Sequence, residues 1–71
     1  MSDPGIQEGT EFPREIGKPA TRALAREGIT RFDQLAAHSA GRLLELHGVG
    51  PKAIRILGGE LARRGLAFAD T

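Results

Sequence analysis

The chain of 71 residues has room for one small domain, and it carries a formal net charge of +1, 39% apolar residues and no cysteine. A chain of this length buries only about 60% of its unfolded surface, which argues against a deep catalytic cleft. Without cysteine, neither a disulfide framework nor a cysteine-based zinc site can form. No apolar run reaches the roughly 20 residues that span a bilayer, so we expect a cytoplasmic protein that does not enter membranes.

Charge divides the chain into two parts. Residues 1–15 carry four acids against one arginine, for a balance of −3, whereas residues 16–71 carry nine Lys or Arg against five acids, for +4. Residues 1–11 are also rich in Gly, Pro, Ser and Thr, and a segment with so little apolar surface does not offset the entropy lost on ordering. We therefore predict a flexible acidic leader over 1–11 and a basic folded domain over 12–71.

The first half of the folded part predicts two helices. Pro19 suits the first turn of a helix because its missing N–H has no partner there, and Gly28 suits a left-handed stop. A helix is therefore expected from about Pro19 to just before Gly28. Thr30, three residues before Asp33, forms a weak relative of a capping box and opens a short helix that ends at about Ala37.

The second half predicts a third helix, capped by Ser39, and a last helix that follows a glycine-rich turn and continues to about Arg64, with Gly65 as its stop. The third helix offers three leucines to the core: Leu43, Leu44 and Leu46. The last helix has one apolar face: Ile54, Leu57, Gly58 and Leu61. Ile56 lies off this face and is expected to be exposed, and two later apolar residues are expected to fold back on the core: Leu66 and Phe68. The Gly58-Gly59 pair predicts either that the backbone of another helix packs closely there or that the helix bends.

The turn itself, Gly48-Val49-Gly50-Pro51-Lys52, is the most informative stretch of the chain. Gly48 and Gly50 permit positive φ and lack a Cβ, so the backbone can reverse tightly and present bare amides at the start of a helix. Such amides, together with the helix dipole, favour an anion. Val49 is expected to point into the core, and Lys52 places a positive charge where a phosphate would lie. The alternative is that the stretch is only a turn between helices.

With its flanking helices, over residues 43–57, this turn resembles the helix-hairpin-helix family. A second resemblance covers residues 12–70: in helix order and spacing, the chain is similar to the C-terminal domain of the bacterial RNA polymerase alpha subunit. The matching stretches are 23–29, 43–46, 48–52 and 61–66. The resemblance implies an all-α bundle of four to five helices, similar also to SAM domains, that contains the helix-hairpin-helix motif and binds DNA in the minor groove.

The resemblance also implies which residues face DNA. Gly50 and Lys52 carry over, whereas the Arg and Asn that the family has at the start of the first helix are replaced by Pro19 and Arg22. Lys18 or Arg22 is therefore expected to take that role, and Arg55, one turn after Lys52, is expected to flank the same phosphate path. The candidate nucleic-acid-binding residues are Gly48, Val49, Gly50, Pro51, Lys52, Arg55, Lys18 and Arg22.

The expected function is non-catalytic binding to the phosphate backbone of double-stranded DNA, mostly independent of base sequence, by a monomer that acts in bacterial transcription. The residue pattern does not distinguish DNA from RNA, and it does not name a protein partner. We predict no cofactor and no metal site, because His38 and His47 have no carboxylate cluster at metal-ligand spacing.

Two alternative functions stay open. The first is a protein-interaction module of the same helical fold, whose contact patch would be an exposed Ile56 or the tail residues Leu66 and Phe68. The second is a fragment of a DNA-repair glycosylase, because Asp70 stands 20 residues after Gly50. The sequence argues against the enzyme, since base flipping needs a pocket that encloses the extruded base, and the chain shows no second lobe to form one.

Overall fold

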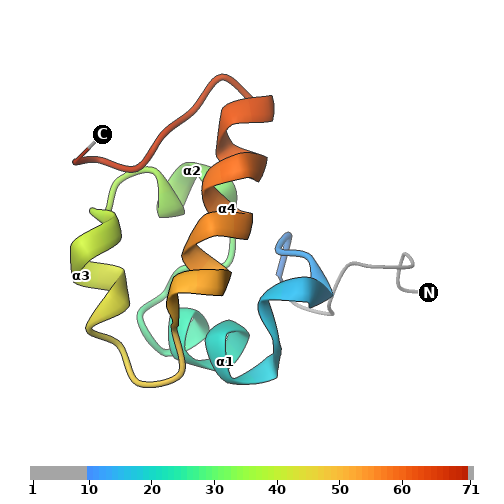
Figure 1. Ribbon diagram of the computed structural model, residues 1–71, viewed down its shortest axis with the longest axis vertical. Helices are drawn as coiled ribbons and strands as arrows, with labels where there is room; N and C mark the ends of the chain where they lie inside the picture. Colours follow the sequence, from blue (N-terminus) through green and yellow to red (C-terminus); the bar gives the residue numbers. More distant parts are fainter. Residues whose placement is uncertain (1–9, 71) are drawn as a thin grey trace.

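The computed structural model describes residues 10–70 as an all-α domain with no strand among these residues (Figure 1). The elements in chain order are the 3-10 helix η1 (Arg14–Ile16) and the α-helices α1 (Lys18–Arg26), α2 (Phe32–Leu35), α3 (Ala40–Leu44) and α4 (Pro51–Arg63). The helical fold class is therefore confirmed. The predicted flexibility of the leader falls mainly on residues 1–9, which lie outside the described residues.

Helix α4 lies along the middle of the domain and packs against η1 and α3, while α1 packs against η1 and lies near the bottom of the view (Figure 1). The core is made of side chains from every element: Phe12, Ile16, Ala20, Ala23, Leu24, Ile29, Phe32, Leu35, Leu43, Val49, Ala53, Leu57, Leu61 and Phe68. Two of these rings, Phe12 and Phe32, meet edge to face with centroids 5.1 Å apart, a geometry that aromatic pairs prefer. Side chains from the beginning, middle and end of the described segment thus form one core.

Two residues of the segment expected to be a leader, Thr10 and Glu11, contact the folded domain. The Glu11 N–H donates to the carbonyl oxygen of Thr30 at 2.9 Å, and the Thr10 hydroxyl donates to the same oxygen at 3.3 Å. The Glu11 carboxylate also accepts a hydrogen bond from the Phe32 N–H at 2.9 Å. Thr10 and Glu11 therefore belong with the folded domain, because they satisfy backbone groups at the start of α2.

The glycine stops are confirmed, whereas the cap of α2 differs from the prediction. Gly28 and Gly65 follow α1 and α4 with φ of 77° and 72°, the left-handed conformation that ends helices. At α2 the reciprocal partner is Gln34, whose Oε1 accepts from the N–H groups of Thr30 and Arg31 at 2.9 and 3.0 Å. The expected Thr30–Asp33 box is therefore wrong, because the longer Gln34 side chain reaches back to these amides.

Helix α3 has two caps, one predicted and one not. The predicted cap is Ser39, whose Oγ accepts from the Arg42 N–H at 3.0 Å. The second is Asp70, whose carboxylate accepts from the N–H groups of Ala40 at 3.0 Å and Gly41 at 3.5 Å. The C-terminal tail is thereby fastened across α3, with a further hydrogen bond of 2.9 Å from the Ala69 N–H to the carbonyl oxygen of His38.

This tail accounts for one glycine of the pair in α4. Phe68 is buried, and a Cβ built on Gly58 would lie 3.3 Å from its ring. The close neighbour of Gly58 is therefore an aromatic side chain and not the backbone of another helix, whereas Gly59 has nothing within 4 Å of a built Cβ, and α4 continues through it. Leu66, in contrast, is 37% exposed and does not fold back on the core.

Two other burial predictions were wrong. Leu44 is 43% exposed, whereas Leu43 on the adjacent face of the short helix α3 is buried. Ile56 was expected to be exposed, but it is half-buried and packs against the core. Ile54 packs against the core from the apolar face as predicted, but the more deeply buried residue beside it is Ala53, which the sequence pattern did not include. The face of α4 that enters the core is therefore rotated toward Ala53 and includes part of Ile56.

Candidate nucleic-acid interface

The turn that precedes α4 uses its two glycines in different ways. Gly48 has φ of 101°, and a Cβ on it would lie 2.8 Å from the carbonyl oxygen of Pro19. Gly50 has φ of −108° and ψ of 177°, with nothing within 4 Å of a built Cβ. The positive φ that both glycines permit is therefore adopted by Gly48 and not by Gly50. The reason is that Gly50 is the N-cap of α4, a position that takes an extended backbone.

The residues between and after these glycines lie as the sequence predicts. Val49 is buried, and its N–H donates to the carbonyl oxygen of Leu46 at 3.1 Å, which closes the turn. Pro51 occupies the first turn of α4, where a missing N–H costs no helical hydrogen bond. Lys52 follows it with an exposed side chain. The turn is thus anchored by Val49 and presents Lys52 to solvent.

Within residues 48–53, four backbone amides donate no hydrogen bond to any of the described residues: those of Gly48, Gly50, Lys52 and Ala53. The first helical donor is Ile54, which reaches the carbonyl oxygen of Gly50 at 3.1 Å. No side chain caps α4. The first N–H groups of a helix carry partial positive charge from the helix dipole, so the start of α4 is a place where an anion can accept several hydrogen bonds.

Helix α1 begins in the same way and lies next to this turn. Its N-cap is Gly17, which provides no side-chain cap. The close approach of Gly48 to the backbone of Pro19 brings the starts of α1 and α4 together, at the bottom of Figure 1. The two starts also have related sequences, Gly17-Lys-Pro-Ala and Gly50-Pro-Lys-Ala, each with an arginine five residues after the glycine. The sequence interpretation missed this internal likeness, although it is visible in the chain.

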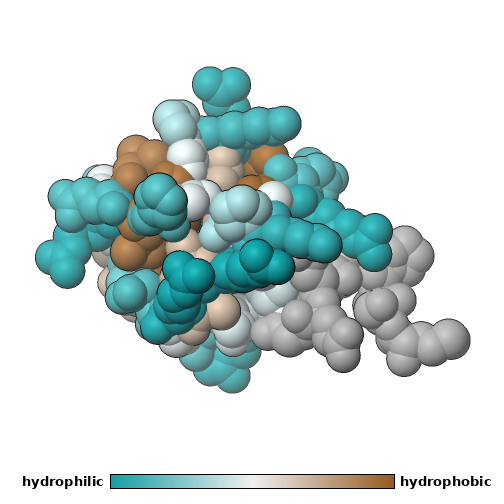
Figure 2. All heavy atoms as spheres, turned by 90° about the horizontal axis from the view of Figure 1, so that it is seen from below, coloured by the Kyte–Doolittle hydropathy of each residue, from teal (hydrophilic) through white to brown (hydrophobic). Residues whose placement is uncertain are grey.

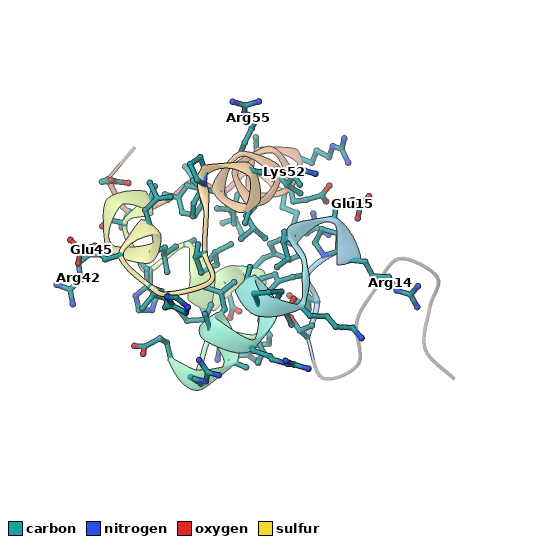
Figure 3. All side chains as sticks on the ribbon, turned by 60° about the horizontal axis from the view of Figure 1, so that its bottom comes forward. Arg14, Glu15, Arg42, Glu45, Lys52 and Arg55 are labelled. Atoms are coloured by element: carbon teal, nitrogen blue, oxygen red, sulfur yellow. The ribbon has the colours of Figure 1, made fainter. Side chains whose placement is uncertain are left out.

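The cations of this face are free of ion pairs. Lys18, Arg22, Lys52 and Arg55 are all exposed, and none forms a salt bridge within the described part of the chain. Seen from below, hydrophilic side chains cover most of the face, with an apolar patch toward one edge (Figure 2). Lys52 extends toward the side of the domain where Glu15 lies, whereas Arg55 points away from the body (Figure 3). The site is thus basic, with one acid near its edge.

The remaining basic residues of α4 have structural contacts. Arg63 and Arg64 each pair with Glu60 at 2.9 Å. The Arg64 guanidinium also lies 4.0 Å from the centroid of the Phe32 ring, which fixes the end of α4 against α2. Cations at the end of a helix also complement the helix dipole. We therefore assign Arg63 and Arg64 a structural role.

The other chemically interesting residues do not gather into a site. Asp70 caps α3, and its hydrogen bond from the Ala40 N–H is the main cause that lowers the pKa of its carboxyl group. His38 and His47 are exposed, and no group of three or more His, Asp or Glu side chains that could hold a metal ion occurs in residues 10–70. None of the helices described is long and apolar enough to cross a membrane.

Comparison with known proteins finds no matching family, no matching curated protein and no matching solved structure.

Proposed function

We propose that this all-α domain contains a helix-hairpin-helix motif, formed by α3, the turn 45–50 and α4, and that it binds the phosphate backbone of double-stranded DNA without catalysing a reaction. The observation that carries this proposal is the pairing of two uncapped helix starts, at Gly17 and Gly50, through the contact of Gly48 with Pro19. Their exposed cations complete a surface suited to phosphate oxygens.

The contrast among the helices supports this assignment. The two short helices α2 and α3 have their first N–H groups satisfied by side chains of Glu11, Gln34, Ser39 and Asp70. The two long helices, α1 and α4, have glycine as the N-cap residue and receive no side-chain cap. Capping removes the anion-binding capacity of a helix start, since the donors are then occupied. The ends left uncapped are those that share one basic face.

The same geometry sets the strength and selectivity that we expect. Backbone amides and cations on phosphates fix orientation but do not read bases. One hairpin and one adjacent helix start offer few contacts, so dissociation constants of about 10⁻⁴ to 10⁻⁶ M at physiological salt are expected. Binding should be largely independent of base sequence, and the cations expected to contribute most are Lys18, Arg22, Lys52 and Arg55.

Titration of the ¹⁵N-labelled protein with a short DNA duplex tests the proposal. Saturable amide shifts should concentrate at Gly48, Gly50, Lys52 and Ala53, because these N–H groups gain a hydrogen-bond acceptor. A single-stranded RNA of equal length, measured in parallel, shows whether duplex DNA is preferred. Shifts centred on α3 and the tail, or no saturation at millimolar DNA, would refute a phosphate site at the starts of α1 and α4.

A further inference from the structure

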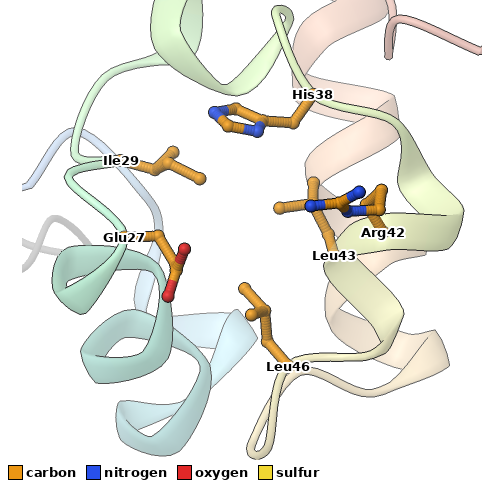
Figure 4. Close-up of a pocket in the computed structure, with 6 residues that line it drawn as sticks. All are labelled: Glu27, Ile29, His38, Arg42, Leu43 and Leu46. Atoms are coloured by element: carbon orange, nitrogen blue, oxygen red, sulfur yellow. The ribbon is translucent and has the colours of Figure 1, made fainter.

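A pocket lies on a part of the surface that does not include the starts of α1 and α4. It has a volume of about 90 Å³ and lies between the end of α1 and the face of α3 (Figure 4). Its lining residues are Glu27, Ile29, His38, Arg42, Leu43 and Leu46. The proposed DNA-binding residues are not among them, so the pocket is a separate feature of the surface.

The floor of the pocket is apolar and well supported. Ile29 and Leu43 are each only 2% exposed, so the parts that line the pocket belong to core side chains held in place on all other sides. Leu46 is half-buried and packs against the same core. The floor can therefore bury an apolar group without any rearrangement of the domain.

The rim of the pocket carries opposite charges on opposite sides. Glu27 projects from the end of α1, while Arg42 and His38 face it from α3 and the segment before α3 (Figure 4). None of these three side chains makes a hydrogen bond or ion pair with the described residues. The Glu27 carboxylate and the Arg42 guanidinium, separated by the apolar floor, are thus both free to pair with charged groups of a ligand.

We propose that this pocket receives one aliphatic side chain of a partner protein, presented in a segment that carries a basic residue on one side and an acidic residue on the other. The size fits a single side chain, since the pocket holds about 90 Å³ whereas sites for drug-sized ligands have about 300–1,000 Å³. The charges fit as well, because Glu27 would pair with the basic residue and Arg42 with the acidic one. Nucleic acid does not suit the rim, since a polyanion offers no cation to Glu27.

The test uses capped tripeptides as probes of the intact ¹⁵N-labelled protein. The matched peptide is Ac-Lys-Leu-Glu-NH₂, and the controls are Ac-Lys-Ser-Glu-NH₂, which lacks the apolar group, and Ac-Lys-Leu-Lys-NH₂, which lacks the acid. We expect saturable shifts at the amides of Ile29, Leu43 and Leu46 with the matched peptide, at millimolar concentrations. The serine peptide should produce no saturation there.

Charge reversal at the rim tests whether Arg42 pairs with the acidic residue of the peptide. Arg42→Glu should weaken binding of the matched peptide by about twofold to fivefold, the range that an exposed ion pair contributes. The same variant should strengthen binding of Ac-Lys-Leu-Lys-NH₂. Arg14→Glu is the matched control variant, because Arg14 is exposed on the other side of the domain (Figure 3) and should leave both affinities unchanged.

Any of the following results would overturn the proposal. One is the absence of saturable shifts at the pocket amides with up to about 10 mM peptide, a concentration that detects even very weak association. Another is equal binding of the serine peptide, or an affinity that Arg42→Glu does not change. A further one is a duplex DNA titration whose main shifts fall on Ile29 and Leu46. Loss of DNA binding at the start of α4 would leave this proposal intact, because the two sites share no residue.

Discussion

Two glycines two residues apart illustrate how the same residue type serves different purposes. Position 48 requires glycine, because its φ is 101° and a Cβ there would lie against the carbonyl oxygen of Pro19. Position 50 does not require glycine for either reason, because any residue can adopt its φ of −108° and nothing lies within 4 Å of a built Cβ. At Gly50 the missing side chain instead leaves the amides of α4 accessible.

Alanine substitutions at the two glycines should therefore have different effects on stability. We expect Gly48→Ala to lower the free energy of unfolding by about 2–4 kcal/mol, from a strained φ together with a backbone clash. Gly50→Ala should change it by less than about 1 kcal/mol, since no strain or clash arises. Chemical denaturation followed by circular dichroism measures both. Equal losses would mean that the turn geometry described here is wrong.

A side-chain cap introduced at position 50 should weaken DNA binding without destabilising α4. In Gly50→Ser the hydroxyl can accept a hydrogen bond from the first amides of α4, as Ser39 does in α3. The variant should be as stable as the wild type, or more stable by a few tenths of a kcal/mol, and should bind duplex DNA more weakly because the donors are occupied. Gly59→Ser, an exposed glycine in mid-helix with open space around it, is the matched control. Unchanged DNA affinity in Gly50→Ser would contradict a phosphate site on these amides.

At the level of elements, the helix ends that depend on nearby residues were predictable. Gly28, Gly65 and Ser39 act within a few residues of the helices they end or begin, so local sequence rules identify them. The caps supplied from a distance were not predictable. Asp70 reaches α3 across 30 residues of chain, and Glu11 reaches α2 across 21. Only the folded core, which brings both ends of the chain to these helices, creates those contacts.

The Asp70 cap predicts a pH dependence of stability. The hydrogen bond from the Ala40 N–H lowers the pKa of the Asp70 carboxyl group in the folded protein, so the charged form stabilises the native state above the ordinary pKa of an aspartate, about 3.9. This contribution should disappear as the pH falls through the lowered folded value. Asp70→Asn should therefore be less stable than the wild type at pH 7, and the difference should shrink below about pH 4. Thermal unfolding from pH 2 to pH 7 measures it; a difference that is the same at all pH values would exclude this cause.

For the whole molecule, the arrangement of α1 against α4 determines the site. The resemblance to the polymerase alpha-subunit domain led us to expect Lys18 and Arg22 beside the turn, and the Gly48–Pro19 contact does bring the start of α1 there. Periodicity alone does not give this result, because it identifies which face of a helix is apolar but not which helix ends meet. The pocket beside α3 was not predicted for the same reason, since its lining residues come from three separate segments.

The central claim is that the basic face of α1 and α4 engages phosphates, and the salt dependence of DNA affinity tests it most directly. If about two to four phosphates of B-DNA are neutralised, the slope of log affinity against log salt should lie near −2 to −4, at roughly 0.9 per phosphate. Lys52→Ala should reduce the magnitude of that slope by about one and should lower the affinity for all duplex sequences by similar factors. Arg63→Ala, which removes a cation paired with Glu60, is the control and should leave the slope unchanged. An affinity that does not respond to salt, or a slope that Lys52→Ala leaves intact, would contradict the claim.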